Sequence, residues 1–377
     1  MRILYISHKL PYPLSDGGKL RVFNHIKHLS KKHEIISLSF IKNKNELKEI
    51  DKLKKFCRVE TVLLPRWKSL INSFFGLFSD EPLRVHYLKD RRFKEKAKRL
   101  SKEADLIIIQ AMRMSQYGFY PEKSILDIVD TPSLQIKRAL KYDNFIWKLI
   151  WSIELPRILN YEKSICKKFK KILVSSEADK MALGCGSVLK NGTEIENIKR
   201  NDPEGNNIMF LGNMGYKPNA DAVKYFVNDI FPLVKRKIKD AKFYIVGKNP
   251  AKVRRYASKD IIVTGFVNDP SEYFLRCKVF AAPLRLGSGI QNKVLEALSY
   301  KVPIITTSIV NEGVEAKEGK EIIVADNARE FAEKIINLIQ NKELRERLSN
   351  NGKKVIVKNY LWSKICKRLD NIIDNDN

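Results

Sequence analysis

Short apolar runs alternate with helix-spaced segments in the first half of the chain. The runs are rich in branched residues and predict strands at residues 2–7, 34–40, 105–110, 125–129 and 171–175. Between them, the spacing of apolar positions predicts helices, as at residues 19–31 and 91–103. Strands that alternate with helices are typical of a parallel sheet covered on both faces.

The second half repeats this alternation after a segment rich in turn formers at residues 191–207. Strands are predicted at residues 208–211, 242–246, 261–264, 279–284, 302–306 and 321–324. Helices are predicted at residues 218–238, 271–277, 328–340, 342–357 and 361–373. A chain of 377 residues can build two cores. The fold class is therefore α/β, and we place the domains at residues 1–190 and 191–357.

The composition, 44% hydrophobic and 30% charged, is that of a soluble globular protein. No apolar run approaches the ~20 residues that a membrane-spanning helix needs. The first run, Ile3 to Ile6, is too short for a signal peptide. We therefore expect a cytoplasmic protein.

Cysteine and histidine positions suggest no metal site. The five cysteines show no Cys-x-x-Cys spacing, which predicts free thiols rather than a disulfide framework or a zinc site. His25 and His28 lie at helical spacing without a third ligand nearby, so we expect both at a helix surface or an interface. His8, at the end of the first strand, is a candidate for lining a cleft.

Charge is concentrated in the first half of the chain. The net charge is +28, and residues 1–200 hold 41 basic against 22 acidic side chains. Nucleic acid or an anionic membrane that displays a lipid-linked acceptor could explain this excess, as could a simply solvated lysine-rich surface. No nucleic-acid-binding signature accompanies the charge, so nucleic acid is not expected as a partner.

Residues 65–88 favour the membrane. Basic residues there flank the aromatic and aliphatic positions of Leu70 to Phe78, a mixture that suits a helix at a membrane interface. Packing of Leu70 to Phe78 inside the first domain is the alternative.

Residues 283–307 carry the clearest chemistry. A strand enters a loop with Gly287 and Gly289, a helix follows, and a second strand returns. Glycines let the backbone approach an anion closely, Ser288 can cap the helix, and first-turn N–H groups attract negative charge. Lys293 and Glu296, three apart, share one flank, where the cation could bind a phosphate and the carboxylate could bind sugar hydroxyls. An ordinary surface pair is the alternative.

This segment, Pro283-Leu-Arg-x-Gly-Ser-Gly followed by Lys293-Val-Leu-Glu-Ala-Leu, resembles the donor-binding segment of retaining glycosyltransferases of family 4. It is similar in particular to the branch found in bacterial surface-polysaccharide and exosortase-associated gene clusters. Further motifs extend the resemblance over nearly the whole chain, including Asp16-Gly-Gly and Phe210-Leu-Gly-Asn-Met-Gly. The resemblance implies the GT-B architecture, with two Rossmann-like domains facing across a cleft and a last helix (358–377) that crosses back onto the first domain.

The resemblance also implies a site. Its donor-binding set would be Gly17, Gly18, Gly212, Asn213, Lys217, Gly265, Phe266, Val267, Arg285, Gly287, Ser288, Gly289, Lys293 and Glu296. Its catalytic set would be Lys293, Glu296, Asp16 and Arg113. Two positions depart from the family pattern: Ser288 stands where many members have the first of two glutamates, and Gln110 stands where relatives often have a histidine. Glutamine cannot act as a general acid or base.

The implied function is transfer of a sugar from a nucleotide-diphosphate donor to a glycan or lipid-linked acceptor with retention of configuration. It would serve bacterial cell-surface polysaccharide or lipopolysaccharide synthesis, at the inner face of the membrane. No cofactor or metal is expected, because an Asp-x-Asp pattern occurs only in the tail, at 374–376. A non-catalytic sugar-nucleotide-binding subunit and a nucleotide-sugar epimerase of the same fold remain alternatives.

Overall fold

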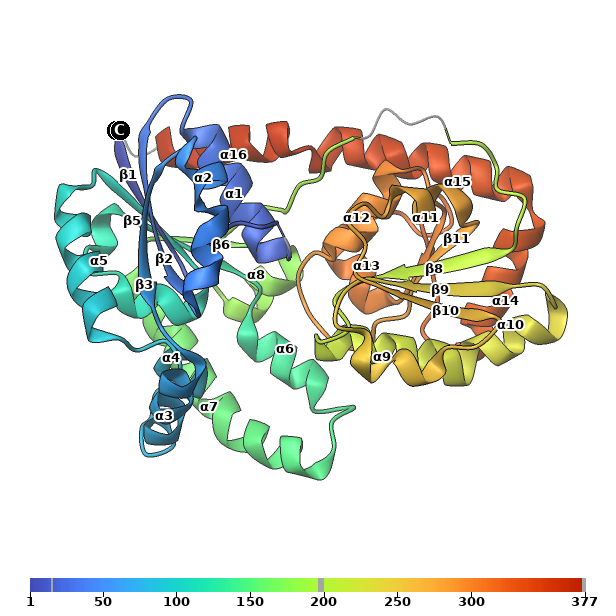
Figure 1. The fold of residues 1–377 in the computed structure, drawn as a ribbon, viewed down its shortest axis with the longest axis horizontal. Coiled ribbons are helices and arrows are strands. Elements are labelled where there is room, and N and C mark those ends of the chain that lie inside the picture. Colours follow the sequence, from blue (N-terminus) through green and yellow to red (C-terminus); the bar gives the residue numbers. More distant parts are fainter. Residues whose placement is uncertain (15, 196–199, 375–377) are drawn as a thin grey trace. The chain divides into compact units, whose positions relative to one another are not determined.

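The protein is described by a computed structural model that covers residues 1–14, 16–195 and 200–374 (Figure 1). The chain divides into two compact units: Met1–Lys190 with Cys366–Asn377, and Asn191–Ile365. The last helix, α16 (Trp362–Asp374), starts in the second unit and ends in the first. Each unit contains one parallel sheet, so the predicted α/β fold class is confirmed. Most of the tail with the Asp-x-Asp pattern lies outside the described residues.

The first unit contains a seven-stranded parallel sheet in the order β3-β2-β1-β4-β5-β6-β7. Its strands are β1 (Arg2–Ser7), β2 (Glu34–Ile41), β3 (Arg58–Leu63), β4 (Leu106–Gln110), β5 (Ser124–Val129), β6 (Lys171–Val174) and β7 (Ser187–Val188). The two edge strands, β3 and β7, were not predicted. β3 has polar residues at half of its positions and β7 has only two residues, so neither shows a continuous apolar run.

Helices connect these strands. They are α1 (Gly17–Leu29), α2 (Ile50–Lys54), α3 (Arg66–Gly76), α4 (Leu83–His86), α5 (Arg91–Glu103), α6 (Pro132–Ala139), α7 (Phe145–Lys168) and α8 (Glu177–Leu183), with the short turns η1 (Lys44–Glu49), η2 (Met112–Tyr117) and η3 (Pro121–Lys123). α1 begins two residues earlier than predicted because an Asp16 carboxylate oxygen accepts a hydrogen bond from the Lys19 amide, 3.1 Å away. α7 was not predicted, because apolar residues lie on all its sides and Pro156 interrupts it.

The second unit contains a six-stranded parallel sheet in the order β10-β9-β8-β11-β12-β13. Its strands are β8 (Asn207–Leu211), β9 (Lys242–Val246), β10 (Ile261–Gly265), β11 (Val279–Ala282), β12 (Ile304–Thr306) and β13 (Ile323–Val324). Its helices are α9 (Lys217–Tyr225), α10 (Phe231–Lys237), α11 (Ser271–Arg276), α12 (Asn292–Ser299), α13 (Ser308–Val314), α14 (Ala328–Gln340) and α15 (Lys342–Val355). The segments η4 (Phe226–Ile230) and η7 (Ile356–Tyr360) are π-helical, and η5 (Pro250–Lys252) and η6 (Arg254–Tyr256) are short 3-10 turns. All six strands were predicted, with bounds that differ by at most two residues.

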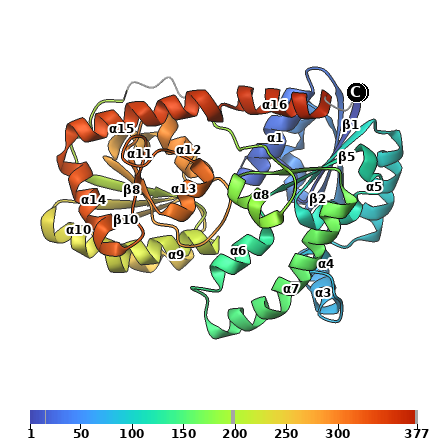
Figure 2. The ribbon, with the colours of Figure 1, turned by 180° about the vertical axis from the view of Figure 1, so that it is seen from behind.

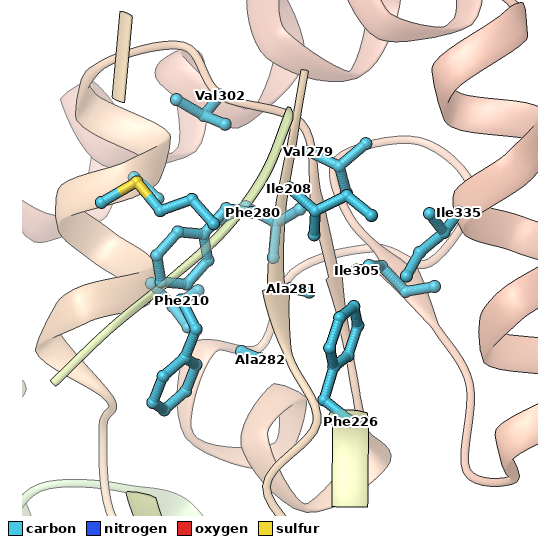
Figure 3. Close-up of a cluster of buried hydrophobic side chains, with 14 of the residues drawn as sticks. Ile208, Phe210, Phe226, Val279, Phe280, Ala281, Ala282, Val302, Ile305 and Ile335 are labelled. Carbon is cyan, nitrogen blue, oxygen red and sulfur yellow. The ribbon is translucent and has the colours of Figure 1, made fainter. Parts of the chain in front are cut away.

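Aromatic and branched side chains fill the core of the second unit (Figure 3). Phe226 and Phe243, from η4 and β9, are fully buried with ring centres 4.2 Å apart. Full burial of one such side chain contributes about 1.5–3 kcal/mol. This core fixes the sheet whose strand ends carry the candidate site.

Two predictions about single residue types were wrong. Cys166 and Cys185 form a disulfide between the end of α7 and the loop after α8, whereas free thiols were expected. The two cysteines are 19 residues apart and meet because α7 and α8 flank β6, which no cysteine spacing reveals. His25 is fully buried and its ring lies 3.1 Å from the Tyr5 hydroxyl, so it is a core residue. His28, by contrast, is partly exposed and bonds to Asp370 of α16 at 2.8 Å.

The large apolar side chains from Leu70 to Phe78 are exposed to solvent, so the alternative that they pack inside the first unit is wrong. Phe74, Phe75 and Phe78 are 58%, 64% and 80% exposed. Within the described residues, no helix is both long and apolar enough to cross a membrane.

Candidate active site

Each sheet reverses its strand order once, and the candidate residues gather at that point. The reversal lies between β1 and β4 in the first unit and between β8 and β11 in the second. All strands of a parallel sheet end at the same edge, and ligands of doubly wound folds bind where the order reverses. The loops after β8 and β11 are therefore the natural binding site of the second unit.

The loop between β11 and α12 is shaped by glycines. Gly287 and Gly289 have φ values of 115° and 70°, a left-handed region that side chains disfavour. A Cβ atom on Gly313 of α13 would lie 2.3 Å from the Gly289 carbonyl oxygen, so α13 packs tightly against this loop. The Thr307 hydroxyl donates to the Leu284 carbonyl at 2.5 Å. The loop is thus held in one shape, and residues 286–290 are buried.

Ser288 does not cap the following helix, so that prediction was wrong. α12 starts at Asn292, and Gln291 occupies the capping position without a side-chain bond. The Ser288 side chain is buried, with the residue 6% exposed, and its hydroxyl has no hydrogen-bond partner within the part of the chain that the structure describes. An unsatisfied buried hydroxyl costs about 1–3 kcal/mol. A ligand oxygen that completes this bond would be favoured.

Lys293 lies on α12 and reaches across to α9. Its ammonium donates to the side-chain oxygen of Asn219 and lies 4.8 Å from the centre of the Phe210 ring. The Asn219 amide nitrogen donates in turn to the Asn213 carbonyl at 3.0 Å. Burial lowers the pKa of Lys293 to about 7, because its partners are neutral and do not stabilise the charged form. An exposed surface pair with Glu296 therefore does not describe this lysine.

Glu296 lies one turn beyond Lys293 and is half-buried. The Ser299 hydroxyl donates to its carbonyl at 2.7 Å. Its three-residue offset from Lys293 places both side chains on one flank of α12, as predicted.

Arg285 is engaged by an acidic partner. It makes two bonds to Asp221 of α9, at 2.8 and 3.2 Å, and its guanidinium carbon lies 4.3 Å from the centre of the Tyr225 ring. This pairing orients the guanidinium and offsets its charge. The proposed contact of Arg285 with a diphosphate stays a prediction.

The other predicted residues of the second unit lie at the same sheet edge. Gly212 and Asn213 follow β8, and the Asn213 side-chain oxygen accepts from the Gly215 amide at 3.0 Å and from Asn249 at 2.8 Å. Lys217 is exposed in the first turn of α9. Gly265 ends β10, and the next two residues, Phe266 and Val267, continue beyond it, with Phe266 68% exposed.

The predicted residues of the first unit gather at its own reversal point. Asp16 caps α1 and pairs with Lys9 at 3.1 Å, while Gly17 and Gly18 open the helix. The Gln110 amide donates to the Gly18 carbonyl at 3.0 Å, so this residue ties β4 to the glycine turn. Sequence reasoning assigned Gln110 no such role.

Two further groups stand beside this turn. Burial lowers the pKa of Arg113 to about 10, with the charge of Arg84 as a second cause. Burial, followed by the charge of Arg113, also holds the pKa of His8 well below its ordinary value. The surroundings of Arg113 and His8 thus disfavour the positively charged form of each side chain. A bound anion nearby would favour that form.

A buried ion pair supports the first unit and was missed from the sequence. Arg21 and Asp127 are fully buried and joined by bonds of 2.7 and 3.0 Å, and Arg21 also donates to the Leu189 carbonyl at 2.9 Å. Among the described residues, no cluster of three or more potential metal ligands occurs.

A glycine loop, a half-buried lysine and an unsatisfied hydroxyl thus lie at the reversal point of a doubly wound sheet, an arrangement that suits a phosphorylated ligand. Residues 205–341 match the model of the glycosyl transferases group 1 family.

An uncharacterized 44.6 kDa protein in the cps region of Klebsiella pneumoniae is 23% identical over 97% of both chains. The capsular polysaccharide biosynthesis glycosyltransferase CapM of Staphylococcus aureus is 28% identical over 30% of both chains. The solved structure of Anabaena Alr3699/HepE in complex with UDP and glucose matches with a TM-score of 0.70 at 12% identity, covering 99% of both chains. These matches identify the chain as a glycosyltransferase: residues 205–341 are similar to the group 1 family, and the two parallel α/β sheets have GT-B-like structural neighbours.

Proposed function

We propose that the second unit binds a nucleoside-diphosphate sugar and that the enzyme transfers the sugar, with retention, to a glycan or lipid-linked acceptor. The observation that carries this proposal is the buried, unpartnered Ser288 hydroxyl in a glycine loop beside the half-buried Lys293. A diphosphate would supply the hydrogen-bond acceptor that the Ser288 hydroxyl lacks and a negative charge beside Lys293, whose partner Asn219 is neutral.

The reaction requires stabilisation of a departing phosphate oxygen. The acceptor hydroxyl oxygen forms a bond to the anomeric carbon on the face from which the β-phosphate leaves, and its proton passes to the leaving phosphate. The Lys293 ammonium and the amides of Gly287 to Gly289 stabilise the developing negative charge. No protein base is needed in this scheme, which is consistent with Gln110 serving as a hydrogen-bond donor to Gly18.

Glu296 would hold hydroxyl groups of the donor, since a carboxylate on the flank of Lys293 accepts hydrogen bonds from vicinal hydroxyls. Ser288, which replaces a glutamate common in the resembled family, can still contact the transferred sugar, but through one hydroxyl instead of a carboxylate. A role of Asp16, Gly17, Gly18 and Arg113 in catalysis stays a prediction.

The proposed setting is bacterial cell-surface polysaccharide or lipopolysaccharide synthesis at the inner face of the cell membrane. Support comes from the two relatives, a protein of the cps region and a glycosyltransferase of capsular polysaccharide biosynthesis, and from the basic first unit. A glycan or lipid-linked acceptor would meet the enzyme at an anionic surface. The association with exosortase gene clusters stays a prediction.

Ligand-dependent thermal stabilisation tests the donor site directly. UDP, GDP and ADP are compared first, and their sugars follow, because a ligand that binds the folded site raises the melting temperature as its concentration exceeds Kd. Inorganic pyrophosphate serves as the probe that does not depend on the base. Stabilisation by at least one nucleotide and by pyrophosphate supports the site, and absence of any stabilisation contradicts it.

A further inference from the structure

The first unit exposes two apolar helical segments that no catalytic step uses. One is α3 with the two residues that follow it, residues 66–78, and the other is the beginning of α7, residues 145–153. Both views of the fold show α3 and α7 as neighbours in the first unit (Figures 1 and 2). Together we call them the two-helix surface.

The amphipathicity of α3 is inverted. Its protein-facing stripe consists of small or polar residues: Ser69 and Gly76 are buried, and Asn72 donates to the Lys89 carbonyl at 2.7 Å. Its solvent-facing side carries the large residues, including Trp67 and Leu70, which are 63% and 64% exposed. A helix that packs its apolar face on a core shows the opposite arrangement.

The first turns of α7 are exposed on every side. Phe145, Ile146 and Leu149 are 81%, 68% and 56% exposed, and Trp147 and Ile153 are also exposed. Since this segment has consecutive exposed apolar residues, no rotation about its axis could bury them in the first unit. Removing these side chains from water therefore requires an apolar environment outside the first unit.

A direct contact joins the two segments. Arg157 of α7 donates to the carbonyl of Leu77 at 3.0 Å and to that of Gly76 at 3.4 Å. Ile153, the last exposed apolar residue of the α7 segment, is one turn from Arg157. The end of α3 therefore contacts α7 one turn beyond the exposed apolar segment of α7.

Charge decides which occupant fits this surface. Residues 66–78 and 145–153 contain no aspartate or glutamate, and Arg66 and Lys148 lie among the apolar positions. Lys68 lies there as well but is paired with Asp90 at 2.6 Å. A second copy of the chain would bring like charges together, while anionic headgroups would pair with them. Tryptophan and phenylalanine beside basic residues are also typical of the membrane interface.

We propose that the two-helix surface inserts into the interfacial layer of an anionic bilayer, with α7 as a second anchor beside α3. This inference deepens the proposed function, because it assigns the membrane contact to particular residues. It also places the first unit, rather than the second, on the lipid.

Vesicle co-sedimentation of the full chain tests this assignment. The probes are vesicles of phosphatidylglycerol mixed with phosphatidylcholine, and vesicles of phosphatidylcholine alone. The paired changes Ile146→Glu with Leu149→Glu, on α7, and Phe75→Glu with Phe78→Glu, in residues 66–78, should each weaken binding to anionic vesicles about tenfold or more. Met181→Glu is the matched control, since Met181 is 81% exposed on α8 of the same unit but outside the surface.

Thermal stabilisation by the preferred nucleotide is measured on every variant. Unchanged stabilisation shows that the donor site is intact, so loss of vesicle binding is separable from failure of the proposed function. Vesicle binding that equals wild type in the α7 variant overturns the proposal. So does sedimentation of the wild type as a dimer that the α7 changes dissociate, without vesicle binding, because a second copy is then the occupant.

Discussion

The two reversal points share a topology but differ in how their polar groups are satisfied. In the first unit, Gln110 is bonded to Gly18, Asp16 caps α1, and Arg21 is paired with Asp127. In the second, the Ser288 hydroxyl has no partner within the described residues and Lys293 has a neutral one. The polar side chains at the first reversal point are thus bonded mainly to other groups of the protein, whereas those at the second can still bind an anionic ligand.

The largest effect is expected from breaking the buried pair of the first unit. Arg21→Ala leaves Asp127 charged and unpaired in the core, which should lower the free energy of unfolding by about 3–5 kcal/mol. Urea denaturation followed by circular dichroism measures this change. An effect below about 1 kcal/mol would mean that the pair contributes little to the structure of the first unit.

The next effect concerns the second unit. Lys293→Ala and Glu296→Ala should each reduce sugar transfer at least about tenfold, because each removes a contact to the donor, and circular dichroism should show an intact fold. Lys224→Ala is the control, since Lys224 is an exposed lysine on α9. Transfer at the wild-type rate in both site variants would refute their assignment.

The pH dependence of donor binding sharpens the comparison further. The unliganded pKa of Lys293 is about 7, and a bound diphosphate favours the ammonium, so binding takes up a proton above that pH. Nucleotide affinity should fall as pH rises from about 7 to 9, approaching tenfold per pH unit. Isothermal titration at several pH values measures it.

The matched variant for this profile is Lys293→Ala, in which the slope should vanish. If nucleotide affinity falls equally steeply with pH in that variant, the proton taken up on binding belongs to a group other than Lys293. The stability of the protein without ligand changes with pH in the opposite direction to nucleotide affinity. Above about pH 7, Lys293 binds fewer protons in the folded than in the unfolded protein, so its contribution to the free energy of unfolding rises with pH.

The smallest effect is expected at the capping aspartate. Asp16→Ala should cost about 1 kcal/mol of stability, whereas Asp16→Asn should cost almost none, because asparagine caps a helix equally well. The proposed catalytic role predicts that transfer falls about fivefold in both variants. A wild-type transfer rate in Asp16→Asn would show that Asp16 only caps α1 and has no catalytic role.

The strands of the second unit could be predicted almost residue by residue, because apolar runs there are buried on both faces. Gly287 and Gly289 could be singled out because glycine lets the backbone approach an anion closely, and both adopt the positive φ values that glycine tolerates. The bond from Lys293 to Asn219 could not be predicted, since it depends on α9 and α12 lying together across 74 residues of sequence. The disulfide and the exposed start of α7 depend in the same way on tertiary placement.

The most direct test of the account is the affinity of the second unit's site for pyrophosphate, measured by isothermal titration with wild type, Lys293→Ala and the Lys224→Ala control. The account predicts binding in wild type and control and at least about tenfold weaker binding in Lys293→Ala. Equal affinity in all three proteins would contradict the claim that the glycine loop and Lys293 form the diphosphate site.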